Sequence, residues 1–93
     1  MRLASPSKGT AITTIALCAG SGSSLFKDCN GIDLFVTGEA GHHFALECIE
    51  RGSYLLLTEH SNSERGFLND VLKTVIGDDC IVSEADKEPL QTL

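Results

Sequence analysis

The stretch that decides the fold reads LLLTEHSNSERGF and spans Leu55–Phe67. An apolar run of strand character ends at Thr58, and a polar turn leads directly into a helix. This junction carries a histidine and a glutamate four positions apart, His60 and Glu64. Because open α/β sheets bind ligands beyond the carboxyl ends of their strands, we expect functional residues here.

The helix behind this junction has the strongest periodic signal in the chain. Apolar residues recur at helical spacing from Ser61 to Ile76, and Gly77 is a natural stop. We therefore predict a helix over about 61–76. Its apolar stripe comprises Phe67, Leu68, Val71, Leu72, Val75 and Ile76.

The remaining apolar runs predict the order β-α-β-α-β-α-β. The strands read as continuous rather than alternating apolar runs, which predicts burial on both faces. We expect an α/β fold with a mostly parallel sheet of about four strands and flanking helices. The predicted strands are 13–18, 32–37, 53–58 and 80–83, and the other helices lie around 25–29 and 41–51.

The length of 93 residues allows one small domain. Residues 1–11 are polar, contain Pro6 and Gly9, and show no period, so they predict a flexible lead-in to a domain over 12–93. Pro89 argues against a central strand in the segment 84–93.

Charge and hydropathy exclude several classes of partner. The net charge is −6 and no Lys/Arg cluster is present, so the electrostatic footprint of a nucleic-acid binder is missing. No apolar run approaches the roughly 20 residues of a membrane helix, and no apolar signal region follows Arg2. We expect an intracellular chain that contacts neither nucleic acid nor membrane directly.

The four cysteines show no metal-binding or disulfide pattern. Cys18, Cys29, Cys48 and Cys80 are scattered, with no C-x-x-C spacing. Three of them lie inside apolar segments, where cysteine behaves as a small hydrophobe. We expect reduced thiols, mainly in the core.

The pair His60 and Glu64 has two interpretations. Imidazole and carboxylate together suit zinc, iron or manganese, although a held ion needs three or four protein donors. Alternatively, Ser61 and Glu64 spell S-x-x-E, a capping box in which Glu64 would bond a free amide at the start of its own helix. On residue types alone, the capping box is favoured.

Other polar groups are weaker candidates. His42 and His43 begin a predicted helix, where the dipole would keep them neutral and able to bind metal, but a surface pair is the simpler interpretation. The run 20–23 (GSGS) follows a strand, yet it lacks the phosphate-binding lysine and the full glycine spacing. Asp33, Glu39 and Glu59 could add carboxylates.

Three blocks of the sequence together resemble a known family. They are ALCAGSGSS at 16–24, DLFVTGEAGHH at 33–43 and EHSNSERGFL at 59–68. In this order they are similar to the carboxyl-terminal part of the NIF-three-like family (NGG-one-interacting factor three), also known as type two GTP cyclohydrolase-like. The segment 83–91 resembles its animal branch.

The resemblance implies a site for two divalent metal ions, zinc, iron or manganese. The family's carboxyl-terminal histidine and glutamate ligands fall on His60 and Glu64, which favours ligation over capping and leaves Ser61 free to cap. His43 and Glu39 would line the cleft. The family's other ligands, a His-His-Pro block and an aspartate, have no match here, so we expect a fragment with an incomplete site.

The resemblance also implies three alternative functions. The first is regulation, as a cytoplasmic and nuclear, self-associating protein that acts in transcriptional co-repressor complexes through protein partners. The second is a metal-dependent hydrolase of the GTP cyclohydrolase type. The third is a truncated product without activity.

Overall fold

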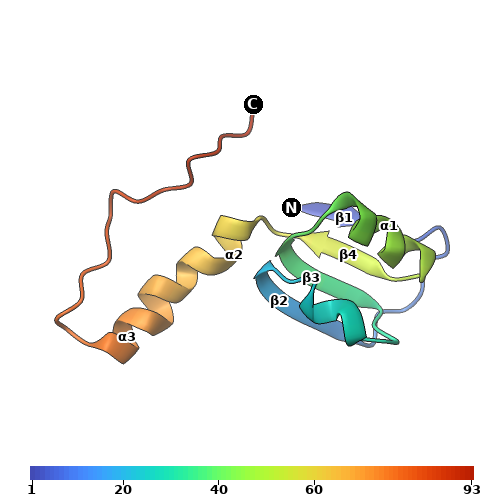
Figure 1. Ribbon diagram of the computed structural model, residues 1–93, viewed down its shortest axis with the longest axis horizontal. Helices are drawn as coiled ribbons and strands as arrows, with labels where there is room; N and C mark the ends of the chain where they lie inside the picture. The colour runs from blue at the N-terminus through green and yellow to red at the C-terminus, as the bar shows by residue number, and fades with distance from the viewer.

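The computed structural model describes residues 1–93 and contains one four-stranded sheet in the order β1-β4-β3-β2 (Figure 1). Strands β2, β3 and β4 are parallel, and β1 pairs antiparallel with β4. The predicted α/β class with a mostly parallel sheet of four strands is therefore confirmed. The strands are β1 (Arg2–Ala4), β2 (Ile15–Ser21), β3 (Leu34–Glu39) and β4 (Tyr54–Leu57).

The helices follow the predicted stripes closely. A 3₁₀ helix, η1 (Leu25–Asp28), follows β2, and α1 (His42–Glu50) connects β3 to β4. The predicted helix over 61–76 extends from His60 to Ile76 and comprises α2 (His60–Phe67), η2 (Leu68–Leu72) and α3 (Lys73–Ile76). The middle part, η2, is π-helical, a wider winding that interrupts regular α-helical geometry.

The core lies on one face of the sheet, beneath α1 and η1. Phe26 from η1, Phe35 from β3, Cys48 from α1 and Leu55 from β4 are all buried. Phe44 completes an aromatic cluster, because its ring centroid lies 5.8 Å from that of Phe35 and 6.1 Å from that of Phe26. These contacts fix the sheet beneath α1.

The opposite face of the sheet is open, so the expected burial on both faces is wrong. The strand register places four apolar residues side by side across this face, in the order Leu17, Val36, Leu56 and Leu3. Leu17 is 75% exposed and Leu3 is 60% exposed. No helix covers this open-face row, because the last helix leaves the sheet instead of folding across it.

The helix from His60 to Ile76 projects away from the sheet and gives the chain an elongated shape (Figure 1). The molecule extends 50 × 32 × 21 Å, and its radius of gyration is 15.9 Å, against about 12 Å for a compact domain of this length. Its accessible surface of 6982 Å² also exceeds the roughly 5,200 Å² expected from its mass. The apolar stripe of this helix is consequently exposed.

Two predicted segments differ from the structure at the ends of the chain. The supposed flexible lead-in contains β1, which is too short to leave a periodic signal and forms only because the edge of β4 is free to pair with it. The strand predicted over 80–83 is absent, since these residues follow the projecting helix, which carries them away from every sheet edge.

The cysteines are all free thiols, and only Cys48 is fully buried. Burial raises the pKa of Cys48 to about 11. Cys18 and Cys29 pack against the core from half-buried positions, whereas Cys80 lies outside it, so the expectation of core thiols fails for Cys80. No helix combines the length and the apolarity that crossing a bilayer requires.

Candidate functional site

The turn between β4 and α2 places the candidate residues. Glu59 precedes the helix with φ 74° and is the only non-glycine residue with a positive φ. Such a conformation is unfavourable for a residue with a Cβ atom and persists only where its surroundings enforce it. The turn brings His60, the first residue of α2, beside Glu39, the last residue of β3.

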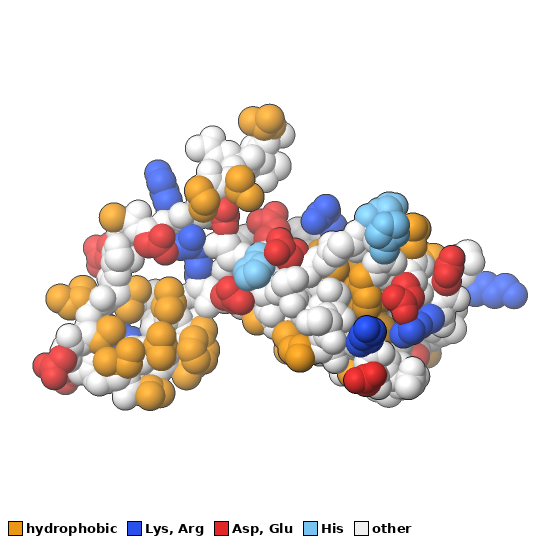
Figure 2. Space-filling model, in the orientation of Figure 1, with side chains coloured by type: hydrophobic (Ala, Val, Ile, Leu, Met, Phe, Trp, Pro, Cys, Tyr) orange, Lys and Arg blue, Asp and Glu red, His pale blue; other side chains and the backbone are white.

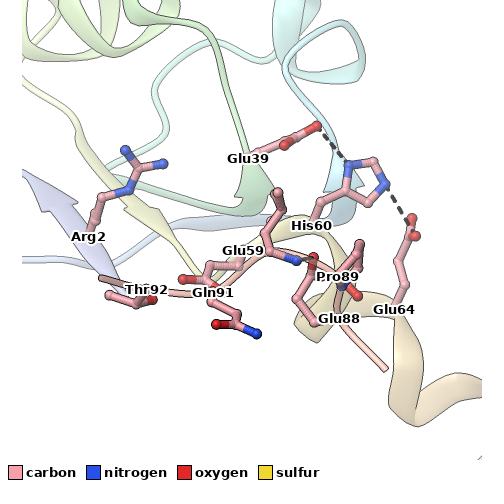
Figure 3. A pocket seen from close by; sticks show the side chains of 12 residues that line it. Arg2, Glu39, Glu59, His60, Glu64, Glu88, Pro89, Gln91 and Thr92 are labelled. Atoms are coloured by element: carbon pink, nitrogen blue, oxygen red, sulfur yellow. Dashed lines mark hydrogen bonds and ion pairs between the residues drawn. The ribbon is translucent and has the colours of Figure 1, made fainter. Parts of the chain in front are cut away.

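His60 lies between two carboxylates. Its Nδ1 atom is 2.8 Å from Oε1 of Glu39, and its Nε2 atom is 3.2 Å from Oε2 of Glu64 (Figure 3). An ionised carboxylate can only accept a hydrogen bond, so the bond between His60 and Glu39 requires a proton on Nδ1, which is the donor. The second ring nitrogen, Nε2, faces Glu64.

This arrangement favours the charged imidazole. The hydrogen bond to Glu39 raises the pKa of His60, and the negative charges of Glu64 and Glu39 act in the same direction against partial desolvation. The His60 side chain is 43% exposed, so its interactions are partly screened by water. A cation placed between Nε2 and Glu64 would replace the proton that this pairing favours.

Gly20 and Gly38 lack the Cβ atoms that would collide with His60 and Glu64. Gly20 has φ +69°, and a Cβ atom there would lie 2.3 Å from Oε1 of Glu64 and 3.1 Å from Nε2 of His60. A Cβ atom at Gly38 would lie 2.6 Å from the carbonyl oxygen of Gly20 and 2.8 Å from Cα of His60. The strand ends therefore approach α2 at backbone distance, which only glycine permits.

Hydroxyl groups hold these strand ends against the helix. The Ser63 hydroxyl accepts a hydrogen bond from the Gly20 amide at 2.8 Å and donates one to the His60 carbonyl at 2.6 Å. The buried Thr37 hydroxyl donates to the Gly20 carbonyl at 3.1 Å and accepts from the Gly22 amide at 3.0 Å. Ser63 and Thr37 were not among the residues predicted from the sequence, although small polar residues beside a glycine-rich strand end were a usable signal.

A polar cavity of about 630 Å³ lies beside His60 and Glu64. Its volume falls within the range of small-molecule sites. Four carboxylates line it, and Arg2 and His60 are the basic residues in its wall (Figure 3). The carboxylates belong to Glu39, Glu59, Glu64 and Glu88, and the rest of the wall comes from Gly38, Ser61 and the segment 89–92.

The capping interpretation of Glu64 is not realised. Glu59 is the residue that precedes α2, and no side chain makes a capping hydrogen bond there. Glu64 faces His60, and Ser61 does not cap but accepts a hydrogen bond from Nε of Arg65. Ser61, although left free to cap, therefore makes no cap.

The structure brings Glu39, but not His43, to the cavity. Glu39 bonds His60 and belongs to the cavity wall. His43 lies on α1 beside His42, with 6.4 Å between the ring centroids, and it is not part of the wall. His43 is at the start of α1, and this helix packs over the core through Phe44 and Cys48 rather than against α2.

The residues present can supply two ligands of a metal site but not a complete set of ligands. Imidazole nitrogen and carboxylate oxygen are donors for zinc, iron and manganese, and the missing Cβ of Gly20 keeps the space beside them open. No group of three or more His, Cys, Asp or Glu side chains converges as metal ligands would. His60 and Glu64 would therefore supply only part of a coordination sphere.

The fold and this junction define an α/β protein whose histidine–carboxylate pair lies at the carboxyl edge of a parallel sheet. Residues 1–89 match the family described as Duf34/NIF3 (NGG1p interacting factor 3). The chain therefore belongs to the Duf34/NIF3 family, which confirms the resemblance of the three sequence blocks.

Three relatives illustrate the similarity. NIF3-like protein 1 of Drosophila melanogaster is 45% identical over 89 residues, covering 90% of this chain and 30% of the relative. NGG1-interacting factor 3 of Saccharomyces cerevisiae is 45% identical over 83 residues, covering 85% of this chain and 29% of the relative. NIF3-like protein 1 of Homo sapiens is 43% identical over 89 residues, covering 88% of this chain and 23% of the relative. The chain thus spans less than a third of the length of these relatives.

Proposed function

We propose that this chain contributes two ligands, His60 and Glu64, to a divalent-metal site of a NIF3-family protein. The observation that supports the proposal is the position of His60, whose Nδ1 is bonded to Glu39 while Nε2 faces Glu64. Histidines that bind metals commonly use one nitrogen for the ion and the other for a carboxylate that fixes the ring. Zinc, iron and manganese suit these donors.

Binding by this chain alone is expected to be weak, because two donors leave most of the coordination sphere to water. The ion, when bound, supplies a Lewis acid beside the cavity. The chain's own residues have separate tasks: Glu39 orients the imidazole, and Gly20 and Ser63 hold the strand end at backbone distance from α2.

Paramagnetic Mn²⁺ tests this assignment, because it broadens nuclear magnetic resonance signals near even a weakly held ion. We expect the His60 ring signals to broaden at lower Mn²⁺ concentration than those of His42 and His43. Glu64→Ala should abolish this preference, whereas the matched variant His43→Ala should retain it. Equal broadening of all three histidines, or an unchanged response in Glu64→Ala, would remove the ligand assignment.

A second proposed function is regulation through protein partners, and exposed apolar surface supports it. Phe67 is 54% exposed, Val75 is 76% exposed, and hydrophobic side chains gather on the projecting helix (Figure 2). Contiguous apolar patches of this kind usually mark interaction sites. The yeast relative is named for interaction with NGG1. Co-repressor partnership, self-association, and a cytoplasmic and nuclear location belong to this proposal.

A binding assay with purified NGG1 protein tests this second function. The immobilised chain is compared with its Val71→Ser and Val75→Ser variants, with a full-length NIF3-family protein as the positive control. We expect the variants to bind less NGG1 than the unaltered chain. Binding to the full-length protein but not to this chain would show that the partner surface lies elsewhere.

The enzymatic alternative is a metal-dependent hydrolase of the GTP cyclohydrolase type, for which the 630 Å³ cavity beside His60 provides space. Incubation with GTP and a divalent metal, followed by chromatography of the products, tests it. Turnover that His60→Ala abolishes would support this activity. No turnover by either the chain or a full-length family member would remove it and favour a chain without catalytic function.

A further inference from the structure

The segment Asp86–Thr92, here called the strap, closes one side of the cavity. The chain turns after α3 and returns alongside α2 (Figure 1). Five of the twelve residues in the cavity wall belong to the strap, namely Glu88, Pro89, Leu90, Gln91 and Thr92. No role of this segment was predicted from the sequence beyond family resemblance.

The strap is fastened to one face of α2. Arg65 forms an ion pair with Asp86 through Nη1 and donates a hydrogen bond from Nε to the Ser61 hydroxyl. Ser61 and Arg65 are four residues apart and therefore lie on the same helix face. Asp86 and Glu88 are two residues apart, so in an extended chain they point to the same side.

The spacing of the two partners matches. Four residues of α-helix rise about 6 Å, and two residues of extended chain span about 6.6 Å. Asp86 can therefore meet Arg65 while Glu88 meets the preceding helical turn at Ser61. In agreement, Glu88 is half-buried whereas its neighbours in the strap are exposed.

The environment of Glu88 also shows this contact. A hydrogen bond from the Leu90 amide lowers the pKa of Glu88, and the Ser61 hydroxyl and the Arg65 charge lower it further. The Leu90 amide lies 3.0 Å from Oε1 of Glu88, within the strap. Glu88 thus bonds the strap's own backbone and lies beside Ser61 and Arg65 of α2.

Nothing apolar holds the strap down. Leu90, its largest apolar residue, is 82% exposed, and the Arg65–Asp86 pair is partly exposed to water. Exposed ion pairs of this kind shift an equilibrium by about fivefold at most. Segments held by so few contacts open and close readily while the rest of the fold remains intact.

We propose that the strap is a lid that controls access to His60 and Glu64, latched by the Arg65–Asp86 pair and by Glu88. The lid rests on the proposed function only in that a divalent metal ion is what it would admit to the cavity. The latch itself needs no metal. In the closed state the strap covers the side of the cavity nearest α2. Loss of the latch increases the exposure of the His60 imidazole beyond the 43% of the closed state.

Acylation of histidine by diethyl pyrocarbonate, measured residue by residue by mass spectrometry, tests the lid without metal. We expect Asp86→Asn to raise the rate at His60 about two- to fivefold. A variant that ends at Ser83 should raise it at least as much. His42 and His43, on α1, serve as internal references whose rates remain unchanged.

Two matched variants separate the latch from a general effect of charge. Glu84→Gln removes one negative charge two residues before the strap without touching the ion pair, and Asp86→Glu keeps the charge. Both should leave the rate at His60 near that of the unaltered chain. An unchanged rate at His60 in the variant that ends at Ser83 would overturn the lid, whatever the outcome of the Mn²⁺ experiment.

Discussion

His60 Nδ1 lies 2.8 Å from Glu39 Oε1, although 21 positions separate these residues in the chain. The contact exists because β3 and β4 are parallel neighbours, so the residue that ends β3 and the helix that follows β4 meet at one edge of the sheet. Glu39 is therefore the residue that sets the orientation of the imidazole. This relationship can be tested independently of the ligands themselves.

Glu39→Gln should weaken metal binding while leaving the fold intact. The amide oxygen can still accept the Nδ1 proton, but it no longer carries the charge that increases the basicity of the ring. Loss of such a supporting carboxylate typically costs ten- to a hundredfold in affinity, so we expect about a tenfold loss in Mn²⁺ titrations. Glu50→Gln, on α1, is the matched control, and equal affinities in the two variants would contradict this role.

Gly20→Ala and Gly31→Ala form a matched pair that separates backbone strain from damage to the site. Both glycines have positive φ, +69° and +70°, so each alanine should cost roughly 1–2 kcal/mol of unfolding free energy. Only the Cβ atom at position 20 meets Glu64 and His60, since nothing lies within 4 Å of Gly31. Urea unfolding should therefore give similar losses, whereas only Gly20→Ala should weaken Mn²⁺ binding.

The opposite result would be informative about the geometry. If Gly20→Ala binds Mn²⁺ as well as Gly31→Ala does, then Glu64 does not occupy the position beside Gly20 that the structure gives it. The Glu64 carboxylate lies at the end of a flexible side chain, so it can move aside without unfolding the protein. The loss of Mn²⁺ affinity in Gly20→Ala is therefore expected to be larger than the difference in unfolding free energy between Gly20→Ala and Gly31→Ala would explain.

The carboxylate of Asp33 should make the unfolding free energy depend on pH. Its carboxylate accepts hydrogen bonds from the backbone amides and the hydroxyls of Thr13 and Thr14, at 2.8–3.1 Å. These bonds, the Thr13 amide first, lower the pKa of Asp33 to about 2. A lowered pKa means that the unfolded chain takes up the proton first, so this contribution is complete above about pH 4 and is lost as the pH falls through about 2.

Urea midpoints measured between pH 5 and pH 2 should therefore fall with pH in the unaltered chain. Asp33→Asn should be less stable at pH 5 and should show a flatter dependence, because its side chain cannot titrate. Asp79→Asn, in the turn after α3, is the control and should follow the unaltered chain. Parallel curves for Asp33→Asn and the unaltered chain would refute the contribution of this carboxylate.

The sequence predicted the elements whose signals are local. The strand and helix around His60 were placed correctly, since an apolar run, a polar turn and a helical stripe are all contained in the sequence from 53 to 76. The approach of His60 to Glu64 follows from their four-residue spacing on a helix. Family resemblance, rather than residue types, favoured this pair over a capping box.

The parts that could not be predicted depend on distant pairing. Arg2–Ala4 becomes a strand only because the edge of β4 is available, and 80–83 remains irregular because its helix leads away from any edge. Continuous apolar strands suggested two covered faces, yet helices cover one. The contact of Ser63 with Gly20 joins residues 43 positions apart, and no local pattern encodes it.

The exposed stripe on the projecting helix should contribute little to the stability of the chain. Val75 is 76% exposed, so Val75→Ser should change the unfolding free energy by no more than about 0.5 kcal/mol. Leu55→Ala, in the core at 1% exposure, should cost about 2–5 kcal/mol.

Val75→Ser should nevertheless reduce self-association in sedimentation velocity and lower the binding of an apolar dye, because it interrupts a contiguous patch. Ile81→Ser, 91% exposed and outside the stripe, should change neither. If Val75→Ser destabilised the chain as much as Leu55→Ala does, the stripe would be packed against another part of the molecule in solution, and a partner surface there would have to be abandoned.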